Sequence, residues 1–240
     1  MFKITGYLKE KRLIIASLII CLLIPAVLFG SVFLKIKQIG LVATLVVVLA
    51  ICPFFLMFEH RKPKARELVL IAVMTAIAVA GRAAFMFLPQ FKPILAVVII
   101  TGLAFGAEAG FMSGALSMLV SNFFFGMTAA VPWQMFCCGL CGFLAGALRR
   151  RRLLKHTVSI CIYGFFSAYL YGAIADIWSV FSFVREFTPP AVLAVFISGI
   201  WFSTILAVAT AFFLALLAGP MEKKLNRVKR KYGLGDTTGC

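Results

Sequence analysis

Arg82 is the side chain whose position most directly suggests chemistry, because it is a cation inside the apolar run from Leu68 to Leu88. A charged residue at the centre of a membrane helix costs about 2.5 to 3.5 kcal/mol on insertion scales, so it usually faces a protein interior or a wet cavity. The alternative is that the long stem of Arg82 lets its guanidinium reach the membrane surface. Arg82 is therefore a candidate for binding a ligand.

Eight further residues are candidate binding residues, since the topology predicted below brings them to the membrane face nearest Arg82. They combine cations, amides, a carboxylate and aromatic rings, a mixture that lines small-molecule sites. They are Phe85, Lys92, Asn122, Phe125, Trp133, Gln134, Asp176 and Arg185. Hydrogen bonding between helices is the alternative for Asn122 and Gln134, and a membrane-interface position is the alternative for Trp133.

Patterns that would indicate catalysis or a metal are missing from the sequence. It contains no HExxH motif, no Walker sequence and no Gly-rich loop that follows a strand. Its 8 Asp and Glu residues are too sparse for paired-carboxylate chemistry. Cys138 and Cys141 have the spacing of a metal or redox pair, but core packing is the better explanation, because no second pair and no His lies near. We expect no enzymatic activity, no metal and no cofactor of its own.

Composition indicates an integral membrane protein. Of the 240 residues, 63% are hydrophobic and only 13% are charged, which does not fit the surface of a soluble domain. The 24 Lys and Arg residues gather in short stretches between apolar runs. They predict membrane topology and not a nucleic-acid surface, because no stretch is long enough to build a soluble face.

The apolar runs predict an all-α protein with eight helices. The first two, from Leu13 to Leu34 and from Ile39 to Phe58, read as a hairpin. The other six are Leu68 to Leu88, Ile94 to Gly106, Ala109 to Phe125, Gln134 to Leu148, Thr157 to Ala175 and Ala191 to Ala218. We therefore expect a hairpin in residues 1–58, a linker in 59–66, a six-helix binding domain in 67–220 and a basic tail in 221–240.

The segment from Ile94 to Gly106 is too short to cross a membrane. As a helix it would rise only about 20 Å, against a hydrocarbon core of about 30 Å. Such a helix leaves room at one end for a loop or a ligand.

The distribution of Lys and Arg predicts the orientation of the chain. Most of them precede the first run, fill the linker at 59–66, follow the sixth run or lie in the tail, and basic loops face the cytoplasm. Both termini are thus expected in the cytoplasm. The connections expected outside are Pro89 to Pro93, Gly126 to Trp133 and Asp176 to Pro190, so that Asp176 falls in a loop.

Two series of small residues have a spacing of four. Gly102, Gly106, Gly110 and Gly114 favour close packing within the helix bundle. Ala72, Ala76 and Ala80 form one face of a helix, for which internal packing and docking of another protein are equally good explanations.

From Arg66 to Ala218 the sequence resembles the substrate-binding S components of energy-coupling factor (ECF) vitamin transporters. The stretches that carry the resemblance are Gly81-Arg82 with Phe85, Leu88-Pro89, Lys92-Pro93, Gly110-Phe111 with Gly114-Ala115, 121–126 (SNFFFG) and 132–136 (PWQMF). The pattern is most similar to the subgroup associated with cobalamin. The runs before Glu59 are not needed by the six-helix fold of that family, and 126–131 is less polar than its usual form.

The resemblance implies a subunit that captures a vitamin outside the cell membrane and delivers it to an importer. Its partners would be a transmembrane T component and two cytoplasmic ATPases, which use the ATP. Ala72, Ala76 and Ala80 match the docking motif for the T component. The sequence-based expectation is therefore uptake of cobalamin. The alternatives are another vitamin, a nucleobase-like micronutrient, or a membrane-bound sensor.

Overall fold

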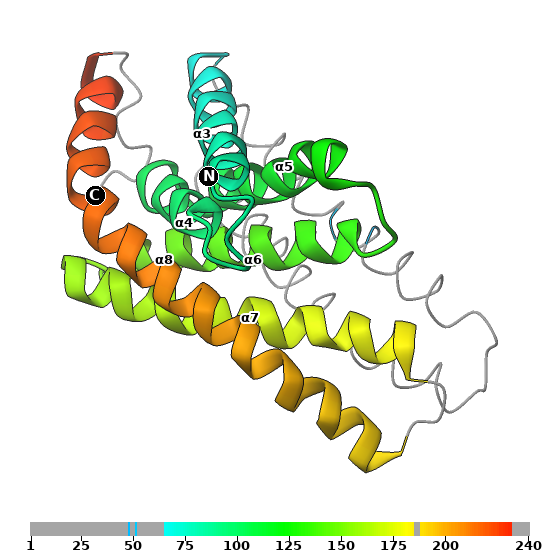
Figure 1. Cartoon of the computed structure of the whole chain (residues 1–240). Coiled ribbons are helices and arrows are strands. Elements are labelled where there is room, and N and C mark those ends of the chain that lie inside the picture. The colour runs from blue at the N-terminus through cyan, green and yellow to red at the C-terminus, as the bar shows by residue number, and fades with distance from the viewer. Residues whose placement is uncertain (1–47, 49–50, 52–64, 185–187, 232–240) are drawn as a thin grey trace, which may run out of the picture.

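The computed structural model describes residues 48, 51, 65–184 and 188–231, and within them the chain is helical with no strand (Figure 1). The elements are α3 (Ala65–Ala84), α4 (Ile94–Phe105), α5 (Ala107–Phe125), α6 (Val131–Arg150), α7 (Thr157–Phe183) and α8 (Pro189–Lys231). These helices match the six segments predicted after the linker. The predicted hairpin lies outside the described residues, except for Val48 and Ile51, which are helical.

The chain is a multi-pass membrane protein. Among the described helices, α3, α6, α7 and α8 are each long and apolar enough to cross a membrane. The prediction of a short helix after Lys92 is confirmed, because α4 has only 12 residues. It begins after Pro93 and ends before Gly106, which has a φ of 101° and starts the turn into α5.

α4 forms the centre of the bundle. All of its residues except Leu103 are buried, and α3, α5, α6 and α8 pack around it (Figure 1). Such a helix has no polar face, because protein surrounds it on every side. α4 is therefore apolar because it packs against protein, and not because it contacts lipid.

Glycines bring α4, α5 and α6 into close contact, as the sequence predicted. A Cβ added to Gly114 would lie 2.6 Å from the carbonyl oxygen of Cys138, and one added to Gly102 or Gly110 would collide with the backbone of Gly142. Without side chains at these positions the helix backbones approach directly. The expected role of these glycines, packing within the bundle, is confirmed.

α7 and α8 form a second layer and are both longer than predicted (Figure 1). Tyr169 and Thr204 join them by a hydrogen bond of 2.8 Å between their hydroxyl oxygens. The expectation that Asp176 lies in a loop is wrong, because α7 continues through it to Phe183. The residues after Asp176 are mostly apolar and allow the helix to continue. α8 likewise passes Pro220 and extends to Lys231.

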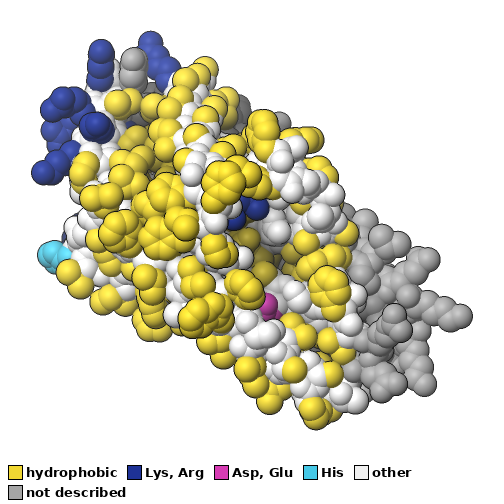
Figure 2. Space-filling model, in the orientation of Figure 1, with side chains coloured by type: hydrophobic (Ala, Val, Ile, Leu, Met, Phe, Trp, Pro, Cys, Tyr) yellow, Lys and Arg dark blue, Asp and Glu magenta, His cyan; other side chains and the backbone are white. Residues whose placement is uncertain are grey.

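Basic side chains gather at one end of the molecule, around the start of α3 and the end of α8 (Figure 2). Arg149 and Arg150, in the last turn of α6, belong to the same connection as Arg151 and Arg152. The rest of this face is largely hydrophobic. This face therefore has one basic end and is largely apolar elsewhere.

Candidate substrate-binding site

The guanidinium of Arg82 lies on α5. Arg82 is in the last turn of α3 and donates a hydrogen bond to Ser121. The same nitrogen, Nη1, is 3.6 Å from Sδ of Met118 and 3.5 Å from Oδ1 of Asn122. The guanidinium carbon lies 4.8 Å from the ring centroid of Phe125. Arg82 is thus directed onto polar groups and an aromatic ring of the neighbouring helix.

Lys92 brings a second cation to the same aromatic ring. Its Nζ lies 5.8 Å from the ring centroid of Phe125. Burial lowers the pKa of Lys92 below its ordinary value, and the nearby charge of Arg82 lowers this pKa further. Within 65–184 and 188–231, neither Arg82 nor Lys92 pairs with a carboxylate. Two cations that have no counter-charge among these described residues favour a ligand with anionic or carbonyl oxygens.

Two amides extend this group of polar side chains to α6. Asn122 is buried, and its Nδ2 donates to the carbonyl oxygen of Met118 and to Oε1 of Gln134, both at 2.9 Å. Gln134 lies in the first turn of α6, which has Pro132 at its start. Asn122 therefore contacts both Arg82 and Gln134. The hydrogen bond between helices, which was the alternative to a binding role for these two amides, is present and fixes the orientation of both.

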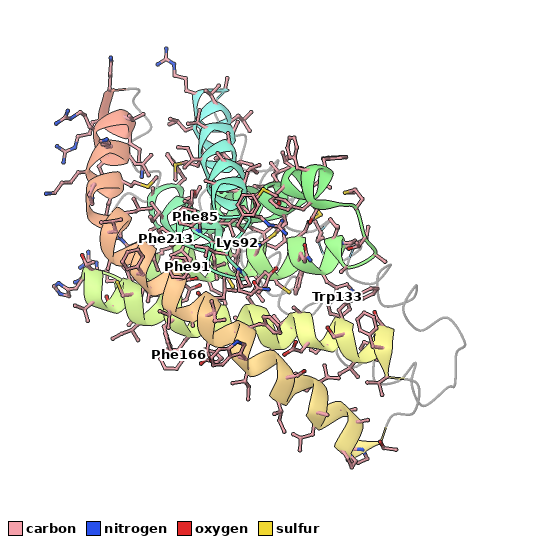
Figure 3. All side chains as sticks on the ribbon, in the orientation of Figure 1. Phe85, Phe91, Lys92, Trp133, Phe166 and Phe213 are labelled. Atoms are coloured by element: carbon pink, nitrogen blue, oxygen red, sulfur yellow. The ribbon has the colours of Figure 1, made fainter. Side chains whose placement is uncertain are left out.

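Phe85 belongs to a different aromatic group, on the α8 side of α4. Its ring centroid is 5.3 Å from that of Phe213 and 6.3 Å from that of Phe91 (Figure 3). Phe91 and Phe213 are in turn 5.4 Å apart. Lys92 follows Phe91 directly, so this aromatic group borders the cation group at the loop before α4.

Trp133 is buried and lies apart from Phe85 and Lys92 (Figure 3). Only 2% of it is exposed, and it packs in a cluster with Ile51, Phe111 and Phe136. Its ring centroid is 6.2 Å from that of Trp178. The indole Nε1 is buried without a hydrogen-bond partner among the described residues. Trp133 is therefore a core residue, and not a tryptophan at the membrane interface.

Asp176 lies on α7 against α8. A Cβ added to Gly199 would lie 2.7 Å from its carboxyl carbon, so the Asp176 side chain packs directly on this glycine. Figure 2 shows basic and acidic side chains emerging in the middle of an otherwise apolar face, away from the basic end. Arg185 lies outside the described residues.

The structure thus brings together five of the nine candidates: Arg82, Lys92, Asn122, Phe125 and Gln134. Phe85 borders this group, whereas Trp133 and Asp176 occupy other surroundings. Sequence reasoning missed Ser121 and Met118, which contact Arg82, and Phe91 and Phe213, which contact Phe85. Ser121 could have been found, since it directly precedes Asn122; the contact with Phe213 has no signal in the sequence.

The three alanines of α3 are exposed. Ala72, Ala76 and Ala80 lie on one face of the helix, and the buried Ile71, Met74 and Ala78 lie on the other. In the part of the chain that the structure describes, the alanines are therefore not used for packing the bundle.

Comparison with known proteins gives one family. The model described as "ECF-type riboflavin transporter, S component" matches residues 62–226. It supports the predicted resemblance to S components, but it does not support the subgroup associated with cobalamin. No curated protein and no solved structure matches the chain.

Proposed function

Because the chain belongs to the family of S components of ECF-type riboflavin transporters, we propose that it captures riboflavin for an ATP-driven importer. Members of this family are transporter subunits and not enzymes, and they work with a T component and ATPases. The observation that carries the proposal is the group formed by Arg82, Lys92 and Asn122 beside Phe125, which combines donors, an amide and an aromatic ring.

The chemistry of these groups suits a flavin. A flat heteroaromatic ring system can pack on aromatic faces, and its carbonyl oxygens accept hydrogen bonds from cations. Arg82 and Lys92 supply such donors, and Phe125 supplies a face beneath both cations. Asn122 and Gln134 can pair with the polar edge of the ring. Phe85, which borders this group, is assigned to the surroundings of the ligand. Trp133 and Asp176 lie apart from the group, so together with Arg185 they remain candidates from the sequence alone.

Purification of the full chain tests the substrate directly. Mass spectrometry of the co-purified ligand, followed by titration with riboflavin and with cobalamin, compares the family's vitamin with the one expected from the sequence. Tight binding of riboflavin alone supports the proposal. Tight binding of cobalamin without binding of riboflavin would overturn the choice of vitamin. It would not affect the conclusion that the chain is a transporter subunit.

We also propose that α3 docks the T component through Ala72, Ala76 and Ala80. Exposed small residues permit close approach of another helix in lipid, where packing and not the hydrophobic effect drives association. The exposure of all three alanines supports this assignment over internal packing.

The proposed orientation places both termini in the cytoplasm and the loop of Lys92 outside. The gathering of Lys and Arg at one end of the molecule supports it. An impermeant thiol reagent tests it in intact cells, in a background without the native cysteines. A cysteine at Gln90 should be labelled and one at Arg151 should not; labelling of position 151 contradicts the orientation.

A further inference from the structure

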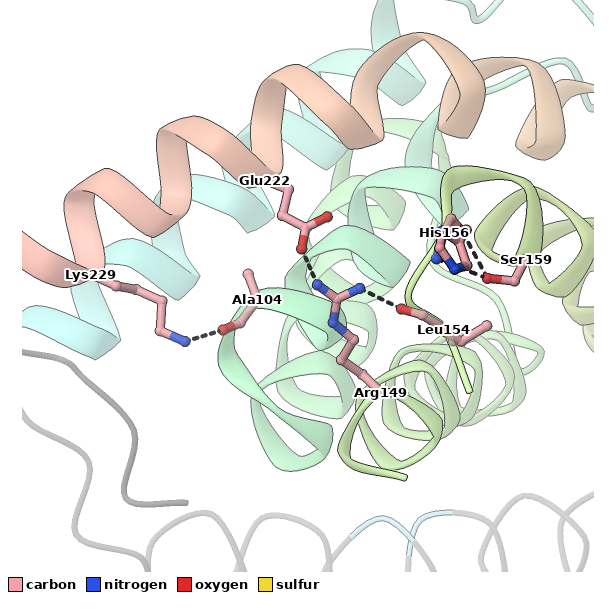
Figure 4. Close-up of polar contacts among 7 residues, drawn as sticks. All are labelled: Ala104, Arg149, Leu154, His156, Ser159, Glu222 and Lys229. Atoms are coloured by element: carbon pink, nitrogen blue, oxygen red, sulfur yellow. Dashed lines mark hydrogen bonds and ion pairs between the residues drawn. The ribbon is translucent and has the colours of Figure 1, made fainter. Parts of the chain in front are cut away.

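Lys229 of α8 holds the end of α4 that lies away from the candidate site. Its Nζ donates to the carbonyl oxygen of Ala104 at 2.7 Å and lies 6.0 Å from the ring centroid of Phe105 (Figure 4). The last carbonyls of a helix lack donors within the helix, and a cation there also interacts favourably with the helix dipole. Lys229 therefore stabilises the last turn of α4.

A second contact fixes the same part of α8. Glu222 pairs with Arg149 at the end of α6, and Arg149 also donates to the carbonyl oxygen of Leu154 (Figure 4). Leu225, between Glu222 and Lys229, is buried. We name residues 221–231 the α8 extension. It contacts α4 through Lys229 and the last turn of α6 through Glu222.

The α8 extension begins just after Pro220. Proline has no backbone N–H, so one hydrogen bond of α8 is missing there, and helices bend at such positions. Figure 1 shows α8 changing direction toward its C-terminal end. The extension can therefore tilt about this point without unfolding the rest of α8.

α4 links the α8 extension to the candidate site. It starts two residues after Lys92, and Ala104 is its second-last residue. A helix of this length measures about 18 Å and is hydrogen-bonded throughout, so a shift of its last turn along the axis also moves its first turn. Lys92 and Pro93 would move with that first turn.

We propose that the α8 extension positions α4, and through it Lys92, so that separation of Lys229 from Ala104 speeds release of the bound vitamin. Lys229 is then a positioning residue that does not touch the ligand. The inference rests on the proposed function for the identity of that ligand. In the proposed orientation the extension lies on the cytoplasmic side, where the importer releases its cargo.

The test uses the full chain in lipid nanodiscs. Lys229→Met keeps the length of the side chain and removes the donor, Lys229→Arg keeps a charged donor, and Lys224→Met removes an exposed charge from the same extension. Dissociation of riboflavin is followed by its fluorescence. Amide hydrogen exchange in residues 85–97 reports the site end of α4 in the absence of any vitamin.

Lys229→Met should speed riboflavin release about five- to tenfold, in the usual range of coupling between distant sites. It should also raise exchange in 85–97, whereas Lys229→Arg and Lys224→Met should leave both measurements close to the unmodified chain. Unchanged exchange in Lys229→Met, or an equal change in Lys224→Met, overturns the proposal.

The exchange measurement separates this inference from the proposed function. If the unmodified chain binds no riboflavin, the choice of vitamin fails, and exchange in 85–97 still decides whether Lys229 positions α4. If Lys229→Met does not fold, Glu222→Gln carries the test, since it loosens the other contact of the extension. Unchanged exchange in 85–97 of that variant would also contradict the proposal.

Discussion

Asn122 donates from its Nδ2 to Oε1 of Gln134 at 2.9 Å and so joins the last turn of α5 to the first turn of α6. Its Oδ1 faces Arg82 of α3 at 3.5 Å. The buried side-chain amide of Asn122 thereby connects α3, α5 and α6, which are separated by loops in the sequence. The arrangement gives the candidate site a fixed polar side before any ligand binds.

Replacement of Arg82 by alanine should weaken binding of the vitamin by roughly one to two decades. A lost hydrogen bond to a buried partner costs about 1 to 3 kcal/mol, and 1.4 kcal/mol corresponds to a factor of ten. Titration of the purified variant measures the change. Arg151→Ala is the matched control, because Arg151 is exposed at the basic end. If Arg82→Ala binds the vitamin with unchanged affinity, the guanidinium of Arg82 is not part of the binding site.

Asn122 and Gln134 should show coupled effects on stability. Each single alanine variant leaves the other amide without its partner, so the double variant should cost less than the sum of the two by about 0.5 to 3 kcal/mol. Thermal unfolding in detergent supplies the four values of the cycle. Asn122→Ala combined with Thr204→Ala serves as the control pair, since Thr204 bonds Tyr169 instead. Additive losses for Asn122 and Gln134 would argue against the hydrogen bond.

Gly114→Ala should destabilise the protein by about 1 to 3 kcal/mol, the usual cost of overpacking. The new Cβ would lie 2.6 Å from the carbonyl oxygen of Cys138, and a backbone atom cannot move aside easily. Gly219→Ala is the matched control in a helix, because a Cβ at that position has no atom within 4 Å. It should stabilise by up to about 1 kcal/mol. Equal melting temperatures for the two variants would contradict the packing of α5 on α6.

Ala76→Trp should prevent assembly with the T component while vitamin binding stays unchanged. A large side chain on an exposed face separates two helices but leaves the bundle behind that face intact. Co-purification with the partner subunits and titration with the vitamin measure the two properties. Ala215→Trp provides an equal change at an exposed position of α8. If the Ala76 variant assembles with the partner subunits as well as the control does, this face of α3 does not dock the T component.

The sequence by itself determined the helices and the family. Runs of apolar residues predicted where the described helices lie, although α7 and α8 extend beyond their runs. Pro93 and Gly106 limit α4, because proline favours a helix start and this glycine adopts a positive φ. The spacing of four residues between glycines likewise predicted close packing of helices, because this pattern can be read from neighbouring positions in the sequence. Arg82, Lys92, Asn122, Phe125 and Gln134 could be selected because polar residues are rare near apolar segments.

Only the tertiary structure decided which side chains meet. Phe85 contacts Phe213, and Lys229 contacts Ala104, across 125 residues or more of chain. The sequence likewise did not indicate that Trp133 is buried. In a membrane protein both lipid-facing and protein-facing positions are apolar, so hydrophobic periodicity does not show which face of a helix is buried. The end of α7 was missed because a single carboxylate, Asp176, resembles the start of a loop. The residues that follow it are mostly apolar and continue the helix, and Asp176 itself packs against Gly199 of α8.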